Sequence, residues 1–175
     1  MPGKEVHVFC AAYRADEIDE LLRYADHIVF NSPAQLQNLA PRPRRRAKVW
    51  DCASIPSARP RTATRFTTPA PPAAVWARPA PSGTRQRQKI LLPGLLDGLH
   101  FHTLCEQDAD ALAVTLDAVA EKFGDLLPKM KWLNFGGGHH ITRPGYDMAT
   151  LEKCIRRARN DWGVTVYLEP GEACA

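Results

Sequence analysis

The chain has 175 residues and a formal net charge of +4, which taken alone would suggest nucleic acid or a membrane surface as a partner, but the distribution of the charge argues against both. The charge is unevenly distributed, because residues 41–90 carry +11 and the rest of the chain carries −7. No stretch approaches the roughly 18 apolar residues of a membrane span, and the first residues lack the apolar core of a secretory signal. Five cysteines without a CxxC pair argue against a disulfide framework or a zinc knuckle, so we expect free thiols in the cytoplasm.

The first forty residues have the pattern of alternating strands and helices. Residues 6–10 are β-branched and apolar, as in a strand, and residues 15–25 have the apolar spacing of a helix. Residues 27–30 again have the composition of a strand. Ser32 followed by Pro33 is typical of a helix start, with serine as the N-cap and proline in the first turn.

The second half of the chain repeats this alternation. Strands are expected at residues 98–104, 131–135 and 164–168. Strands that recur about every thirty residues with a helix between them form βα units, so we expect a parallel sheet and the α/β fold class. The two helices are marked by the apolar faces Leu112, Leu116, Val119, Phe123 and Leu151, Ile155, Ala158, Trp162.

Residues 42–92 fit neither pattern. They are rich in Pro and Arg and have almost no helical or alternating period, which is typical of a disordered segment. A structureless loop of this length is uncommon inside a compact domain. We therefore divide the chain into N-terminal βα units at 1–41, an irregular segment at 42–92, and central βα units at 93–175.

Three polar, glycine-containing strings each begin where an expected strand ends. They are GLHFHTLCEQ (98–107), NFGGGHHITR (134–143) and YLEPGE (167–172). In parallel βα folds the chemistry lies at the carboxyl ends of the strands, so these strings predict one shared pocket.

Several side chains in these strings could carry chemistry. Residues 136–138 are three glycines that could bring backbone N–H groups close to an anion, or could form only a tight turn. His100 and His102 lie two apart on a strand and therefore share a face. With His139 and His140 they could bind a metal, or one could stack on a planar cofactor. Hydrogen-bonded interior histidines are the alternative, and we favour it for His100.

Two carboxylates follow the last strand. Glu169 could hold a proton on a cofactor nitrogen or act as an acid or base, and its alternative role is a salt bridge at the rim. Pro170 and Gly171 set the chain's direction after it. For Glu172 the alternative is plain solvent exposure.

Together the strings resemble the carboxynorspermidine decarboxylase family, pyridoxal-phosphate enzymes of polyamine synthesis. The resemblance implies a partial (β/α) barrel of the alanine-racemase type with parallel strands, interrupted by an irregular Pro/Arg-rich segment. The residues that carry it are VHVFCAAY (6–13), DHIVFNSPAQL (26–36), GLHFHTLCEQ (98–107), MKWLNFGGGHHITRPGYD (130–147) and VYLEPGEA (166–173).

The resemblance also implies roles for the pocket residues. His102 would lie against the face of the pyridine ring of pyridoxal 5'-phosphate. Gly136, Gly137 and Gly138 would bind its phosphate through backbone N–H groups, and Glu169 would pair with its protonated pyridine nitrogen. A cationic ring is the electron sink that a decarboxylation needs.

The implied substrate is carboxynorspermidine or carboxyspermidine, which would yield norspermidine or spermidine and carbon dioxide. Glu172 would contact an amino group of this polyamine, because ammonium groups call for carboxylates. Cys105, Glu106 and His139 are further substrate-binding candidates. We expect no metal, nucleic-acid or membrane partner, and the resemblance implies a homodimer for the full-length family.

The chain departs from the family in two places. The family's Schiff-base lysine lies on an early strand upstream of the residues present here, so no catalytic residue is assigned and we expect little or no activity from this chain. The family also continues beyond EPGEA into the rest of the barrel and a β domain that completes a dimeric active site.

A third departure concerns the basic segment. Where the family has GLRINP and then HAIYDPCAPGSRLG, this chain has WDCASIP at 50–56 and TRFTTPAPPAAVWA at 64–77. Codons exist for both strings that give the family residues when they are read one nucleotide out of register. We therefore interpret residues 42–92 as a frame-shifted reading, which sequencing of the source DNA across this interval would test.

Two functions from other classes compete with this interpretation. One is a metal-dependent barrel hydrolase that uses His100, His102 and either His139 or His140, which stoichiometric zinc would favour. The other is a non-catalytic module in which residues 42–89 bind nucleic acid, although this segment has few aromatic residues for stacking. A steep salt dependence of DNA binding would favour the second alternative.

Overall fold

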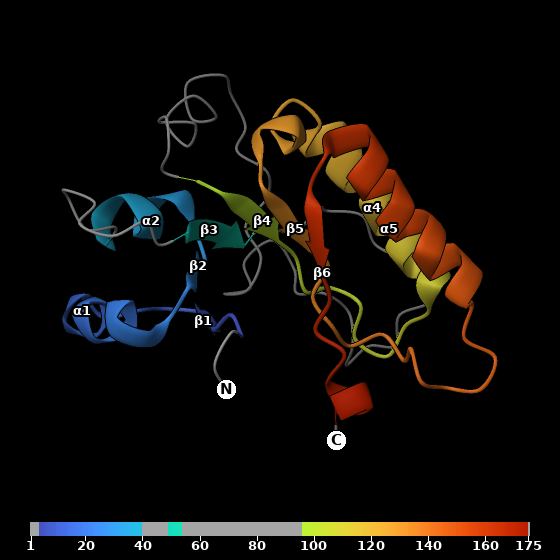
Figure 1. Ribbon diagram of the computed structural model, residues 1–175, viewed down its shortest axis with the longest axis horizontal. Coiled ribbons are helices and arrows are strands. Elements are labelled where there is room, and N and C mark those ends of the chain that lie inside the picture. The colour runs from blue at the N-terminus through green and yellow to red at the C-terminus, as the bar shows by residue number, and fades with distance from the viewer. Residues whose placement is uncertain (1–3, 40–48, 54–95, 175) are drawn as a thin grey trace.

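The computed structural model describes residues 4–39, 49–53 and 96–174. These residues form a six-stranded sheet in which every neighbouring pair is parallel (Figure 1). This arrangement confirms the α/β class and the parallel strands. The strand order follows the chain order: β1 (His7–Cys10), β2 (His27–Phe30), β3 (Val49–Ala53), β4 (Gly98–His100), β5 (Trp132–Asn134) and β6 (Thr165–Tyr167).

Four described α-helices and one short 3₁₀ turn lie between the described strands, and a second 3₁₀ turn follows β6. At the start of α2 the hydroxyl of Ser32 accepts a hydrogen bond from the Gln35 N–H at 3.2 Å, as its sequence pattern predicted. None of the described helices is long and apolar enough to cross a membrane. The helices are α1 (Ala15–Tyr24), α2 (Pro33–Leu39), α4 (Ala109–Phe123) and α5 (Met148–Trp162), and the turns are η1 (Leu127–Lys129) and η2 (Gly171–Cys174).

The main hydrophobic core lies between the sheet and these helices. Because the strands are parallel and consecutive, right-handed crossovers place their helices on one face of the sheet. Figure 1 shows α4 and α5 packed side by side on that face. Alternate strand residues point into this core, and the apolar face expected for α4 is buried there. The core includes Ile28, Phe30, Leu99, Phe101, Leu133 and Phe135 from the strands and their ends, and Leu112, Leu116, Val119 and Phe123 from α4.

The opposite face of the sheet is concave. Five strand spacings of about 4.8 Å would put the edges of a flat six-stranded sheet about 24 Å apart. Yet the Tyr167 hydroxyl on β6 donates to Glu5 Oε2, just before β1, at 2.6 Å. The rings of His7 and Tyr167 also lie 4.7 Å apart between centroids. The edges therefore approach one another across this concave face, which carries the remaining strand residues.

Polar and aromatic side chains fill the concave face. Trp132 and Val29 form a small apolar cluster on it, with Tyr167 packed against them. The indole of Trp132 lies over Gly98 on the adjacent strand, where a Cβ atom would come within 2.2 Å of the ring. Gly98 is thus the position that gives the indole its room, and the two faces of the sheet differ sharply in polarity.

Two elements differ from the sequence-based expectation. Within the segment 42–92, expected to be irregular, residues 49–53 form β3 between β2 and β4. Parallel pairing uses main-chain groups, and these five residues contain neither proline nor glycine, so two flanking strands stabilise a strand here. The other residues of that segment, and the frame shift proposed for it, lie outside the described residues.

Strand β4 is also shorter than the expected strand at residues 98–104. It ends at His100, and the chain then turns at Glu106, which has a φ of +57°. The Glu106 N–H donates to the Gly138 carbonyl at 2.8 Å. The residues expected to form the end of the strand instead form a loop that contacts the loop at Gly138. His102 lies in the first of these loops.

Candidate active site

Three strand exits bring polar side chains together at the carboxyl edge of the sheet. The Asn134 amide at the end of β5 donates to Glu169 Oε1 at 2.8 Å. His102 Nδ1, in the loop after β4, lies 3.2 Å from Glu169 Oε2. His100 Nε2 lies 3.6 Å from the same oxygen. We call Asn134, Glu169, His100 and His102 the carboxyl-edge cluster.

The electrostatics of the carboxyl-edge cluster keep Glu169 ionised. The hydrogen bond with His102, the nearby His100 and the Asn134 amide together lower the pKa of Glu169 to about 2, against the opposing effect of burial. Burial lowers the pKa of His100 to about 4, so this imidazole is neutral at physiological pH. A fixed carboxylate therefore faces one neutral imidazole and one exposed imidazole.

His100 differs from its expected environment. Its side chain is 3% exposed, as expected for an interior histidine. However, neither ring nitrogen has a hydrogen-bond partner within the described part of the chain. His100 is thus interior, as expected, but the expectation that it is hydrogen-bonded is wrong. The Glu169 oxygen lies 3.6 Å from the ring nitrogen, which is too far for a hydrogen bond.

His102 Nδ1 has two candidate partners that demand opposite roles. The Gly137 N–H points at it from 3.4 Å, which requires Nδ1 to accept. Glu169 Oε2 at 3.2 Å requires Nδ1 to donate. We favour donation to the carboxylate, because the contact is shorter and the acceptor is ionised. The Gly137 N–H then lacks a good acceptor in His102.

The three consecutive glycines lie where loops from three strands approach closely. A Cβ on Gly136 would lie 2.3 Å from the Phe101 carbonyl oxygen, and one on Gly137 would lie 2.0 Å from the Glu169 carbonyl oxygen. Gly136 and Gly138 also have positive φ values of +69° and +86°. The close packing of these loops explains why all three positions are glycine, even with no ligand bound. The tight-turn interpretation is therefore sufficient to explain the choice of residue.

Two histidines of the candidate set lie apart from the carboxyl-edge cluster. His139 is buried and hydrogen-bonded to the Tyr146 hydroxyl at 2.6 Å. His140 pairs with Glu172 instead. The four-histidine metal set is therefore not assembled, although His100, His102 and Glu169 place one donor atom each within 4.8 Å of one another.

The substrate-binding candidates occupy different environments. Burial lowers the pKa of His139 and raises that of Tyr146 to about 12, so the Tyr146 hydroxyl donates to a neutral His139. His139 thus stabilises the loop after β5 through a buried hydrogen bond. Cys105, Glu106 and Glu172 are exposed near the strand exits and remain accessible to a ligand.

Sequence reasoning missed two of these residues. Asn134 fixes Glu169 and also accepts the Gly136 N–H at 2.8 Å. Its place as the last residue of a strand, directly before the glycines, was the available signal. Tyr146 lies seven residues after its partner His139, a separation that no local pattern links.

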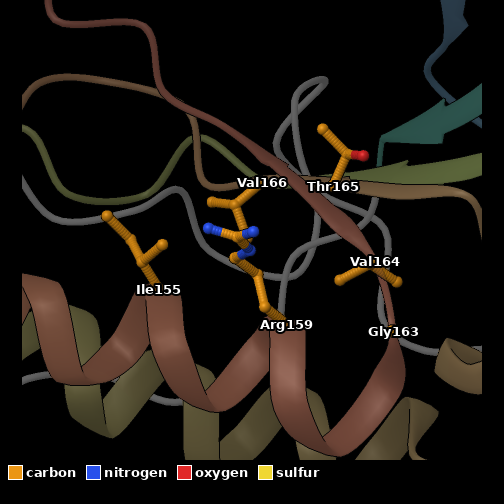
Figure 2. Close-up of a pocket in the computed structure, with 6 residues that line it drawn as sticks. All are labelled: Ile155, Arg159, Gly163, Val164, Thr165 and Val166. Carbon is orange, nitrogen blue, oxygen red and sulfur yellow. The ribbon is translucent and has the colours of Figure 1, made fainter.

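The structure also has a hollow outside this cluster (Figure 2). It lies between α5 and β6 and is lined by Ile155, Arg159, Val164 and Val166, among others. The hollow opens beside the amino end of β6, whereas Glu169 follows the carboxyl end. It therefore belongs to the helix side of the sheet and adds nothing to the carboxyl-edge cluster.

Comparison with known proteins finds enzymes of one reaction class. No protein-family model matches the chain. The chain is 39% identical, over 97% of its length, to a carboxynorspermidine/carboxyspermidine decarboxylase from Campylobacter jejuni and covers 42% of that protein. It is 32% identical, over 99% of its length, to a carboxyaminopropylagmatine decarboxylase from Synechocystis and covers 43% of it. The chain thus spans well under half the length of the curated relatives it matches.

Solved structures agree with these relatives. A crystal structure of carboxynorspermidine decarboxylase from Campylobacter jejuni, complexed with norspermidine, superposes with a TM-score of 0.78 and 36% identity. The superposition covers 98% of this chain and 42% of that one. A diaminopimelate decarboxylase superposes with a TM-score of 0.70 at 12% identity, which supports the fold alone.

Proposed function

Since this chain is homologous to one segment of the carboxynorspermidine/carboxyspermidine decarboxylases, we propose that it contributes the cofactor-holding segment of a pyridoxal-phosphate-dependent polyamine decarboxylase. The observation that carries the proposal is the carboxyl-edge cluster, where Glu169 is ionised and held by Asn134. The proposed substrate is carboxynorspermidine or carboxyspermidine, and the proposed products are norspermidine or spermidine and carbon dioxide.

We propose that the sheet is a section of an alanine-racemase-type barrel. Consecutive parallel strands with their helices on one face are the arrangement of β/α barrels. The side-chain contacts between the β1 and β6 edges support the curvature that a barrel needs. In this division residues 1–41 supply the first βα units and residues 93–175 carry the cofactor residues, with the irregular segment 42–92 between them.

The donor set of the carboxyl-edge cluster fits a pyridine ring. Asn134 holds one oxygen of Glu169, and the other faces the mouth of the site beside His102. An ionised carboxylate in that position can hold a proton on a ring nitrogen. The half-exposed imidazole of His102 is free of core packing, so it can lie against the ring face.

The phosphate is assigned to the backbone of Gly136, Gly137 and Gly138. Of these groups, the Gly137 N–H is the best candidate, because its 3.4 Å contact to His102 is weak. The Gly136 N–H is already bonded to Asn134. When bound, pyridoxal phosphate supplies an electron sink for the pair released with carbon dioxide. Glu169 maintains that capacity by keeping the ring nitrogen protonated.

The substrate's ammonium groups are assigned to the exposed residues beside the strand exits. Glu172 is 52% exposed at its side chain and pairs with His140, a partner that an ammonium group can displace. Cys105 and Glu106 lie in the neighbouring loop. His139 enters this proposal only as a brace for that loop, because its ring is buried against Tyr146.

Catalysis also needs a lysine to attach the cofactor covalently. No lysine among the described residues contacts His102 or Glu169. We therefore expect the 175-residue chain to bind pyridoxal phosphate without turning over substrate. Release of carbon dioxide from carboxynorspermidine by the purified chain would contradict this expectation.

The remaining proposals concern the setting of the protein. Cys10, Cys105 and Cys154 are free thiols in the described part of the chain, which agrees with a reducing compartment. We propose a cytoplasmic location and, for the full-length enzyme, a homodimer.

Equilibrium dialysis of pyridoxal phosphate against the full chain tests the cofactor site. Glu169→Gln keeps the size of the side chain but removes the charge that pairs with the ring nitrogen. We expect at least about a tenfold loss of affinity, equivalent to about 1.4 kcal/mol. Glu152→Gln, which changes an exposed carboxylate on α5, is the matched control and should bind as the wild type does. Equal affinities for the wild type and Glu169→Gln would refute the assignment.

A further inference from the structure

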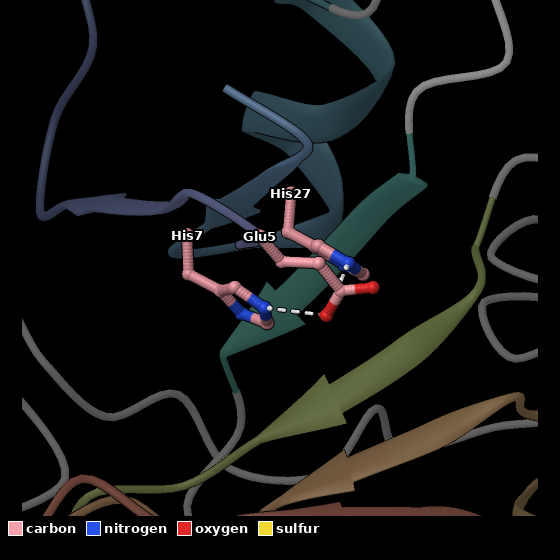
Figure 3. A group of neighbouring side chains, drawn as sticks. All are labelled: Glu5, His7 and His27. Carbon is pink, nitrogen blue, oxygen red and sulfur yellow. Dashed lines mark ion pairs between the residues drawn. The ribbon is translucent and has the colours of Figure 1, made fainter. Parts of the chain in front are cut away.

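A second group of histidines and a carboxylate lies at the opposite end of the concave face. Glu5 and His7 are two residues apart, so their side chains leave the chain on the same side. His27 is the register partner of His7 on β2. Figure 3 shows the three side chains converging over the sheet, with both imidazoles facing the Glu5 carboxylate. We call these three residues the amino-edge cluster, and the proposed decarboxylation uses none of them.

The three donor atoms of the amino-edge cluster are already close. His7 Nε2 lies 3.6 Å from Glu5 Oε2, and His27 Nε2 lies 3.7 Å from the same oxygen. Donor atoms of all three residues lie within 4.8 Å of one another. Two bonds of a tetrahedral zinc ion hold their ligand atoms about 3.4 Å apart, so the two histidine–glutamate separations each need only a small contraction.

A neighbouring side chain fixes the carboxylate. The Tyr167 hydroxyl donates to Glu5 Oε2 at 2.6 Å. Metal-binding carboxylates are commonly oriented by such outer hydrogen bonds. The same hydrogen bond is the main cause that lowers the pKa of Glu5, and burial lowers the pKa of His27.

We propose that Glu5, His7 and His27 form a zinc-binding site, with the remaining coordination positions open to water. Two imidazoles on adjacent strands, with a carboxylate just before the first strand, are a donor set that zinc favours. The site lies at the amino ends of β1 and β2, whereas the proposed cofactor site lies at the carboxyl ends of β4, β5 and β6. The two proposals can therefore fail independently.

The stacked arrangement of the two imidazoles must change before both rings can bind one metal ion. The rings of His7 and His27 lie 4.0 Å apart between centroids and 16° from parallel. A metal bound through Nε2 lies near the plane of each imidazole, and two nearly parallel stacked rings cannot share such a point. One ring must turn. His27 is 6% exposed and is packed by Trp132, whereas His7 is 22% exposed, so His7 is the ring that turns.

Zinc binding to the tag-free full chain tests the proposal. The protein is first treated with a chelator and kept free of pyridoxal phosphate, and zinc chloride is then titrated against a chromophoric chelator. We expect one zinc ion per chain at this site, and at least a tenfold weaker affinity in Glu5→Gln and in His7→Asn. Both changed side chains are partly exposed, so circular dichroism should show an intact fold, and Glu5→Gln suffices if His7→Asn does not fold.

The carboxyl-edge cluster supplies the matched control, because it also brings together two histidines and a glutamate. His102→Asn removes an exposed imidazole there and should leave zinc affinity unchanged. Nitrogen-15 NMR of the imidazoles should show zinc shifting His7 and His27. No zinc binding by the wild type, or binding that His102→Asn abolishes and Glu5→Gln does not, would overturn the proposal.

Discussion

The amino-edge and carboxyl-edge clusters share a composition but differ in what holds their carboxylate. Each has one glutamate and two histidines on the same concave face. At the carboxyl edge an amide from Asn134 holds Glu169, and one of the two imidazoles, that of His100, is buried. At the amino edge a hydroxyl from Tyr167 holds Glu5, and the two imidazoles stack. The identity of the residues therefore does not determine the chemistry.

The difference follows from position along the strands. The carboxyl edge opens into glycine-containing loops with backbone N–H groups, which suit a planar, phosphate-bearing group. The amino edge has two imidazoles at one register level of adjacent strands and a carboxylate two residues earlier in the chain, an arrangement that suits a single ion. Tyr167 and Glu169 are two residues apart at the end of β6, so one segment contributes to both clusters.

The largest expected effect comes from a substitution that adds a steric clash beside the carboxyl-edge cluster only. In Gly137→Ala the new Cβ would lie 2.0 Å from the Glu169 carbonyl oxygen, which must move. We expect a loss of about 3 kcal/mol in unfolding free energy and a loss of pyridoxal-phosphate binding, measured by urea unfolding and dialysis. Gly171→Ala is the control, because nothing lies within 4 Å of its added Cβ. Equal stabilities of the two variants would show that the three loops do not approach as described.

An intermediate effect concerns the buried imidazole of the carboxyl edge. His100 has a pKa of about 4 in the folded chain and an ordinary value of 6.5, so the unfolded chain binds more protons between these values. Stability should therefore fall as the pH falls from 6.5 to 4, by up to about 3 kcal/mol from this residue. Urea unfolding of His100→Gln should show a flatter dependence in that window. His27→Gln should flatten it in the same direction, because burial also lowers the pKa of His27.

The smallest expected effect tests the hydroxyl that holds Glu5. Tyr167→Phe removes the 2.6 Å hydrogen bond but keeps the ring against His7. Zinc affinity should fall about tenfold, the usual cost of losing an outer hydrogen bond to a metal ligand. Pyridoxal-phosphate affinity should stay the same. A parallel loss of both affinities would mean that the two clusters are not independent.

Much of the fold was predictable from local pattern. The strand expected at 27–30 and the helix start at Ser32 appear where the residues placed them, because apolar alternation and capping act over a few residues. The alternation also placed His100 opposite Leu99 and Phe101, which lie in the main core. What local pattern could not provide is β3, whose pairing depends on both neighbouring strands.

The candidate site was predictable to a smaller extent. Glu169 and His102 come together because both follow parallel strands, an inference that spacing alone permits. Asn134 was overlooked because its contact with Glu169 depends on the rotamers of two side chains that follow from different strands. The amino-edge cluster was overlooked because its residues have no glycine or proline to mark them. Its hydrogen bond from Tyr167 joins residues 162 positions apart.

That long separation has a consequence for how the chain folds. The contact between Glu5 and Tyr167 closes a loop of 162 positions, so its entropic cost is recovered only after the intervening units have formed. We therefore expect the contact to form on the native side of the folding barrier, so that its loss accelerates unfolding and leaves the folding rate nearly unchanged. Stopped-flow measurements on Tyr167→Phe should thus show a faster unfolding limb. The Tyr167 hydroxyl would then prolong the lifetime of the folded state.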